Sequence, residues 1–344
     1  MTEDNPLNQP QEIPFEEVVS ALLDDQQVLD PRYLYPLSDL SGSDLRKLWE
    51  IWDEIDLDRR RGMMEDLERL TETNTLLSFE NIFRRALKDR DDQVRFFAAR
   101  AIEAFDTDDL IPDFLEILEE DQSADVRAVT ASILGKYIYR GELDKISSED
   151  QNQIEEALLT ILESDQPDRV RQSALEAMGY SPRPEAHREI EKAYQSGVPE
   201  WMASALFAMG RSFDHRYDEL VLDNLQHTSP EIRREAVRAC GELYLEDAVP
   251  VLVDLLDDLG DVRRAAIWAL SQIGGEEAGP AINQLLDLSV SEEEYILIQE
   301  ALERLSFLDD GVSMPLFDLP LDENDHDFSE FEDDFDDEDA YWYS

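Results

Sequence analysis

The stretch GDVRRAAIWALSQIG, residues 260–274, is the clearest copy of a pattern that recurs along this chain of 344 residues. Each copy begins with an acidic residue, continues with an apolar residue and usually an arginine, and carries a small residue one helical turn later. Apolar residues that recur at this spacing lie on one face of a helix. The copies return at about the length of one helix pair, so the sequence predicts a repeat protein of stacked helices.

The spacing of the copies is regular apart from one interval. We number each copy from the apolar residue that precedes the arginine, which is position zero. The interval between the second and third copies is longer than the others, and we expect the excess, around Lys136 to Asp150, to be an insertion in a connecting loop. Position zero is filled in turn by Val94, Val126, Val170, Trp201, Ile232, Val262 and Leu297.

Positions zero, four and eight of each copy are predicted to face the core. Position four holds a small residue in every copy, such as Ala236 or Ala266, which lets two helices approach closely. A glycine follows position eight in four copies and suits either a left-handed helix end or a tightly packed contact. These glycines are Gly135, Gly179, Gly210 and Gly241.

The segments DDQVRFFAARAIEAF, SADVRAVTASILG, DRVRQSALEAMG, SPEIRREAVRACG and GDVRRAAIWALSQIG resemble HEAT repeats of the short type, also called phycobilisome-lyase HEAT-like repeats. The resemblance covers residues 77 to about 307. The copies at Trp201 and Leu297 lack the arginine and rest on spacing. The resemblance implies an all-α fold, a right-handed α-solenoid of antiparallel helix pairs, with the second helix of each pair on the concave side.

The sequence divides into four predicted parts. Residues 1–13 are expected to form a disordered N-terminus, residues 14–76 the N-terminal helices and a degenerate capping repeat, and residues 77–307 the HEAT-like array. Residues 308–344 are expected to form a disordered acidic-aromatic tail, because the run from Asp322 to Asp339 contains no lysine or arginine and its carboxylates repel one another.

Composition narrows the classes of partner. The chain has 30 Lys and Arg against 83 Asp and Glu, a formal net charge of −53, which disfavours binding to DNA or RNA. Cys240 is the only cysteine, so no intramolecular disulfide can form. The N-terminus lacks the features of a signal peptide, and no apolar run is long enough to cross a bilayer. We therefore expect a cytoplasmic protein with no nucleic acid and no membrane partner.

The sequence carries no recognisable catalytic, cofactor or metal motif. Its histidines do not lie at ligand spacing, and the paired His-Glu dipeptides of deoxyhypusine hydroxylases, which use similar repeats, do not occur here. Phycobilin lyases also use such repeats, but nothing in this sequence singles out a tetrapyrrole pocket. The arginines of position one are predicted to bridge to nearby acids. They are Arg95, Arg127, Arg171, Arg233 and Arg263, and the acids, in the same or the adjacent repeat, include Asp92, Asp125, Asp168, Glu231 and Asp261.

Positions two and six of the second helices are predicted to face the concave groove. In the copies that begin at Trp201, Ile232 and Val262, these positions gather aromatic and arginine side chains, the residue types enriched at binding hot spots. An alternative is that the rings pack between helices and the arginines pair with acids. The candidate partner-binding residues are Phe207, Arg234, Arg238, Arg264 and Trp268.

Three functional hypotheses follow. The first is a non-enzymatic scaffold or adaptor that binds a protein or peptide partner on the concave face. The second is an accessory factor or lyase-like enzyme acting on a chromophore or modified residue of a client protein. The third is that the acidic tail binds a basic partner as a nucleic-acid mimic. The tail can alternatively act as a solvating segment, or lie in the concave groove of its own chain and be displaced by a partner.

Overall fold

A computed structural model describes residues 13–105, 107–258, 260–286 and 291–309. These residues form helices joined by turns and contain no strand, which confirms the all-α class. The predictions for the N-terminal twelve residues and for the tail beyond Asp309 lie outside the described residues. The chain divides into two compact units, Met1–Ile133 and Leu134–Ser344, whose border lies within helix α7, Ala124–Glu142.

The first unit consists of helices that pack on one another in sequence order. Helix α3 packs along α5, and the short helix α4 also packs against α5. The first helix coincides with the predicted Phe15–Leu23 segment. The helices are α1 (Phe15–Leu23), α2 (Gly42–Ile51), α3 (Leu57–Thr73), α4 (Glu80–Ala86), α5 (Asp92–Ile102), α6 (Ile111–Glu120) and the first part of α7.

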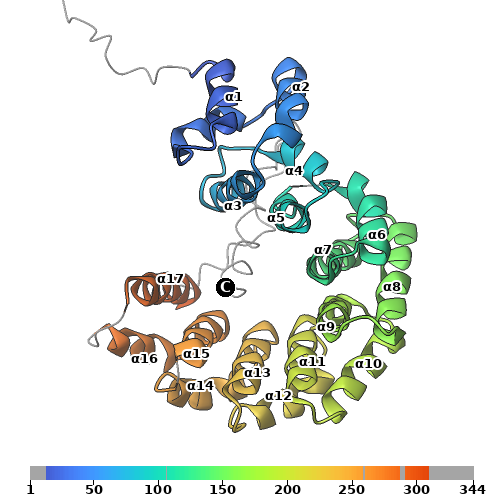
Figure 1. Ribbon diagram of the computed structural model, residues 1–344. Helices are drawn as coiled ribbons and strands as arrows, with labels where there is room; N and C mark the ends of the chain where they lie inside the picture. Colours follow the sequence, from blue (N-terminus) through green and yellow to red (C-terminus); the bar gives the residue numbers. More distant parts are fainter. Residues whose placement is uncertain (1–12, 106, 259, 287–290, 310–344) are drawn as a thin grey trace, which may run out of the picture. The chain divides into compact units, whose positions relative to one another are not determined.

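The second unit is a stack of helix pairs. Figure 1 shows its second helices, α9, α11, α13, α15 and α17, as one row on the inner side of the curve that this unit describes, with the first helices outside them. Each second helix packs on the next one in the row. The helices are α8 (Ser148–Glu163), α9 (Asp168–Ala177), α10 (Pro184–Gln195), α11 (Pro199–Arg211), α12 (Asp218–Asn224), α13 (Pro230–Glu242), α14 (Val249–Leu255), α15 (Gly260–Ile273), α16 (Ala278–Leu285) and α17 (Glu292–Asp309).

Helix starts follow local signals in the sequence. The Ser229 hydroxyl accepts a hydrogen bond from the Ile232 N–H at 3.4 Å, and Pro230 occupies the first helical position of α13. The Asp91 carboxylate caps α5 in the same way through the Val94 N–H. A side-chain acceptor satisfies an amide that has no partner inside the helix, and proline loses no hydrogen bond at that place.

The predicted core rows are buried. Positions zero, four and eight of α13, Ile232, Ala236 and Cys240, are fully buried, and the same holds for Val170, Ala174 and Met178 of α9. Each large apolar side chain contributes about 1.5–3 kcal/mol when it is removed from water. Trp201 and Leu297, at position zero of their copies, are the exceptions, because both residues are only half-buried.

The four glycines that follow position eight serve close packing. None of them has a positive φ, so the tightly packed alternative is confirmed and the left-handed one is wrong. A Cβ added to Gly210 would lie 2.9 Å from the Cα of Ala239 on the next second helix. Gly179 faces Ala208, and Gly241 faces Ala269, in the same manner. Since such contacts are shorter than a carbon atom allows, any side chain at these positions would push the helices apart.

The long interval between the second and third copies is helical, so the prediction of a loop insertion around Lys136 to Asp150 is wrong. Helix α7 continues to Glu142, and α8 begins at Ser148. Tyr137 and Ile138, within the extra segment, are buried. The extension therefore adds to the packed core, since it carries apolar residues at helical spacing.

Candidate partner-binding site

The candidate residues lie on helices α11, α13 and α15 of the second unit. Phe207, which is only 6% exposed, is the centre of a stack of arginine and aromatic side chains. The Arg211 guanidinium lies 4.1 Å from the centroid of the Phe207 ring, and the Arg238 guanidinium lies 4.4 Å from it. Arg211 also lies 5.0 Å from the ring centroid of Tyr180. Each contact has the geometry of a cation–π interaction. The stack links the end of α9 to α11 and α13.

The stack continues into α13 and towards α15. The Arg238 Nε donates a hydrogen bond of 2.9 Å to the Glu242 carboxylate one turn further along the helix. Trp268 of α15 lies over Gly241, where its Cζ3 atom is only 2.5 Å from the place of an added Cβ. Trp268 is half-buried. The glycine therefore makes room for this indole ring.

Arg234 and Arg264 form local ion pairs. The Arg234 Nη2 lies 2.7 Å from the carboxylate of the neighbouring Glu235, and the Arg264 guanidinium bonds the Asp261 carboxylate one turn earlier. The side chains of Arg234 and Arg264 remain 37% and 42% exposed. The structure thus joins Phe207 and Arg238 directly, sets Trp268 beside Gly241, and leaves Arg234 and Arg264 paired within their own helices.

Sequence reasoning missed Tyr180, Arg211 and Glu242, which complete the stack. All three occupy position ten of their copies, directly after the glycine. Since positions two, six and ten are four residues apart, they share one helix face. The same rule that selected Phe207 and Arg238 would have selected this third row if the helix had been followed one turn further.

The arginines of position one form the predicted ladder, but mostly with other acids. Arg95 binds the Asp121 carboxylate through two hydrogen bonds of 2.7 Å, and Arg233 binds Asp258 through bonds of 2.7 and 2.8 Å. Arg263 reaches Glu294 at 3.5 Å. Arg171 bonds the acid named for it, Asp168, at 3.4 Å.

The remaining arginine contacts of the ladder go to the backbone. Arg127 donates to the carbonyl of Asp121, and Arg95 donates to the carbonyl of Asp89, 2.9 Å away, so both reach the end of the preceding first helix. Arg171 binds the carbonyl of Leu162 at 3.1 Å and lies 5.0 Å from the Trp201 ring centroid. Arg95 and Arg171 each contact residues of two copies, because an arginine side chain is long enough to reach beyond its own helical turn.

Two titratable groups outside this face, His187 and Cys240, are held by packing. The His187 Nδ1 lies 3.0 Å from the Tyr217 hydroxyl, and burial together with the nearby Arg216 lowers the pKa of His187. Burial raises the pKa of the Cys240 thiol to about 12, so the thiolate needed for reactivity does not form near neutral pH. In the part of the chain that the structure describes, no group of three metal-ligating side chains lies together.

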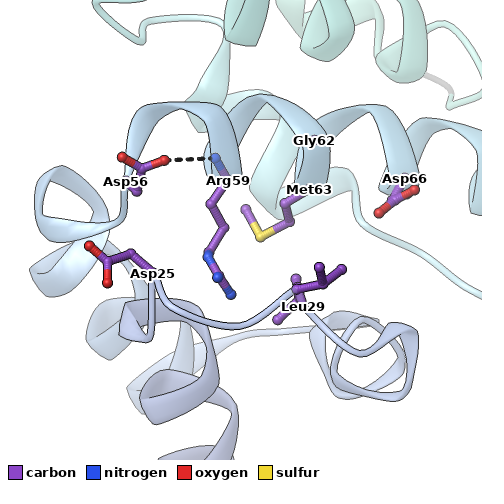
Figure 2. A pocket seen from close by; sticks show the side chains of 8 residues that line it. Asp25, Leu29, Asp56, Arg59, Gly62, Met63 and Asp66 are labelled. Atoms are coloured by element: carbon purple, nitrogen blue, oxygen red, sulfur yellow. Dashed lines mark hydrogen bonds between the residues drawn. The ribbon is translucent and has the colours of Figure 1, made fainter.

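A shallow hollow of about 280 Å³ lies in the first unit, beside α3. Figure 2 shows Arg59 reaching from α3 towards the segment that carries Asp25 and Leu29. The Arg59 guanidinium donates to the carbonyls of Ala21, at 2.9 Å, and of Gln27. Arg59 therefore fastens the end of α1 to α3, and the hollow is the space left beside that attachment.

Comparisons with known proteins concern the helical repeats. Residues 218–306 match a family model described as HEAT repeats. No curated protein matches the chain. Across the described residues, no helix is both long and apolar enough to span a membrane.

Three solved structures illustrate the likeness of fold. The complex of CpcE and CpcF of phycocyanin lyase from Nostoc is 20% identical, with a TM-score of 0.45 over 66% of this chain and 94% of that one. Importin beta is 13% identical, with a TM-score of 0.41 over 85% of this chain and 44% of that one. Human deoxyhypusine hydroxylase is 15% identical, with a TM-score of 0.33 over 75% and 95%. The family match therefore identifies HEAT repeats within residues 218–306 of this chain.

Proposed function

We propose that this protein is a non-enzymatic scaffold or adaptor that binds a protein or peptide partner on the inner face of its second unit. The inner face is the side of the second helices formed by positions two, six and ten. Its proposed contact residues are Arg234, Arg238, Arg264 and Trp268, and the buried Phe207 supports Arg238 from beneath. The observation that carries the proposal is the stack centred on Phe207, because it fixes rings and guanidinium groups in place before any partner arrives.

Preorganisation favours binding. A long arginine side chain normally loses conformational freedom when it binds, and that loss opposes association. Arg238 already has this freedom restricted by the Phe207 ring on one side and Glu242 on the other. Arginine and tryptophan held in this way are the residue types that dominate measured binding energies.

The charges on this face favour an acidic or aromatic segment. Arg234 uses its Nε and Nη2 groups on Glu235, and Arg264 uses one Nη group on Asp261. A guanidinium carries five N–H donors, so each arginine retains donors that point away from its own acid. A carboxylate of the partner can therefore bind without displacing the existing pair.

The test is capture of a partner by purified full-length protein and three variants. Arg238→Glu and Trp268→Ala should lose the partner, while Arg188→Glu should retain it, because Arg188 lies on the first helix α10 with an equally local acid, Glu185. Circular dichroism and the thermal midpoint establish that each variant is folded. Binding is then measured again with the isolated partner.

Two outcomes would contradict the proposal. Equal loss of the partner in all three variants would indicate general charge effects, and retention by the folded Arg238→Glu and Trp268→Ala variants would place binding elsewhere. A visible absorption band in the purified protein would instead favour the lyase-like alternative, in which a chromophore is held.

A further inference from the structure

Exposed aromatic residues occupy the turns that follow two consecutive second helices. Phe213 follows α11 and is 55% exposed, and Tyr244 follows α13 and is 58% exposed. They lie at position twelve of their copies, at the edge of the helix stack, away from the inner face defined above. The corresponding residue after α15 is Gly274.

The backbone at this position is left-handed in all three copies. The φ angles are +49° at Phe213, +53° at Tyr244 and +78° at Gly274. At Tyr244 the turn is closed by a 3.0 Å bond from the Leu245 N–H to the Cys240 carbonyl, a pattern in which glycine is the favoured residue. A bulky side chain is unfavourable in this conformation, and such outliers gather at functional sites. Phe213 and Tyr244 thus place exposed rings where glycine would suit the turn better.

The surroundings of Tyr244 are acidic. Glu246 and Asp247, which follow it at the start of the next helix pair, are exposed. No cation among the described residues forms an ion pair with either of them. Near Phe213, Arg216 is held by Asp214 at 2.6 Å. The edge therefore offers two exposed rings and the carboxylates of Glu246 and Asp247, which form no ion pair within the described residues. The protein as a whole carries a formal net charge of −53.

The spacing of the two rings restricts the shape of a ligand. Adjacent packed helices lie about 8–10 Å apart. Since α11 packs on α13, we expect the two turns to repeat at about that distance. A polyproline II segment has three residues per turn and rises 3.1 Å per residue, so its side chains return to the same side after about 9 Å. Aromatic surfaces are known to receive such segments because the polyproline II conformation is already formed before binding.

We propose that Phe213 and Tyr244, with Glu246 and Asp247, form a docking edge for a proline-rich segment of a partner protein that carries arginine or lysine at every third residue. Each cation lies over one ring, and the acids next to Tyr244 neutralise the adjoining charge. This edge does not depend on the inner-face proposal, because it uses other residues and ligands of opposite charge.

The experiment measures fluorescence polarisation of two labelled probes against the full-length protein. The first probe is (Arg-Pro-Pro)4, and the second has the same composition with its four arginines grouped at one end. Both probes carry the same net charge. A difference in their affinities therefore reports the spacing of the arginines and not a general attraction to an anionic protein. We expect tighter binding of the first probe at physiological ionic strength.

The variant Phe213→Asn/Tyr244→Asn should weaken binding of the first probe about ten-fold, as expected for the loss of two cation–π contacts. Asparagine tolerates a positive φ, so the turns are retained. Tyr295→Ala, which removes an equally exposed ring on α17, should leave binding unchanged. Glu246→Gln/Asp247→Asn should weaken binding less, with the difference largest at low salt.

The proposal is overturned if the double asparagine variant binds within two-fold of the original protein, or if the two probes bind equally well. Should that variant fail to fold, Tyr244→Gly replaces it, because the neighbouring copy already has Gly274 at this place. In the original protein, bound probe should also protect the Tyr244 ring from oxidative labelling, and an unprotected ring would equally count against the edge.

Discussion

Two kinds of arginine contact hold the helices together, and each unit offers an example of one kind. In the first unit, Arg61 binds the Asp91 carboxylate and Arg95 binds Asp121, each through two hydrogen bonds. The bond from Arg61 lowers the pKa of Asp91, so the pair stays charged near neutral pH. In the second unit, Arg211 and Arg238 lie on the two sides of the Phe207 ring.

The difference shows what each kind of contact can supply. An ion pair fixes the register of two helices, but it depends on pH and salt. A guanidinium on a buried ring adds packing that neither condition removes. The inner face of the second unit is therefore expected to keep its shape at pH values and salt concentrations that weaken the ion pairs of the first unit.

The largest effect should come from removing the ring at the centre of the stack. Phe207→Ala deletes a buried aromatic side chain and separates two arginines from their common support, so we expect a loss of about 3–5 kcal/mol in the free energy of unfolding. Urea unfolding measures this loss. Tyr295→Ala, at an exposed ring, should change stability by less than about 0.5 kcal/mol. A loss below about 1 kcal/mol for Phe207→Ala would show that the stack contributes little.

A smaller effect concerns a buried acid of the first unit. Glu68 on α3 is 5% exposed and lies 2.7 Å from the Arg100 Nε on α5. Burial raises the pKa of Glu68 from 4.5 to about 7, although Arg100 acts in the opposite direction. The folded protein therefore holds this proton more tightly than the unfolded chain does between pH 4.5 and about 7. Stability from this group is full below pH 4.5 and is lost as the pH rises through about 7.

At about 1.4 kcal/mol for each pH unit, this loss is at most about 3.5 kcal/mol. Glu68→Gln removes the titrating group. As the pH is raised from 5 to 8, the free energy of unfolding of the original protein should therefore fall relative to that of the variant. Glu65→Gln, at an exposed acid on the same helix, is the control. Parallel stability curves for Glu68→Gln and the original protein across this range would refute the assignment.

The smallest expected effect distinguishes an arginine–acid ion pair from an arginine–ring contact within the second unit. Arg233 finds the acid Asp258 in the next copy, whereas Arg171 lies on the Trp201 ring, since the turn before Trp201 carries Ser196 and Gly197 in place of an acid. A double-mutant cycle of Arg171→Gln and Trp201→Leu should give a coupling energy of about 0.5–1 kcal/mol that persists in high salt. Coupling that vanishes in salt would mean that charge, and not the ring, holds Arg171.

Much of this architecture could be predicted from the repeated pattern. The helices Phe15–Leu23 and Ile111–Glu120 begin and end where the apolar spacing and the prolines place them. The site was predicted only in part. Phe207 and Arg238 meet as neighbours, but Tyr180 and Arg211 were missed because the helix face was not followed to its last turn. Arg95 and Arg233 bind Asp121 and Asp258 in the adjacent copy. The sequence allowed acids of the same or the adjacent repeat and could not choose between them, because a long side chain reaches both.

The sequence by itself determined the helix pairs, their number of residues and the rows that are buried, because apolar periodicity and small residues act within one or two helical turns. Tertiary structure alone decided which arginine meets which acid or ring, that the extra segment after Gly135 is helical, and that Phe213 and Tyr244 hold a left-handed turn. The arginine contacts join residues about one repeat apart, and the turns and the helical extension depend on how neighbouring helices stack. A sequence pattern within one or two helical turns records neither of these relationships.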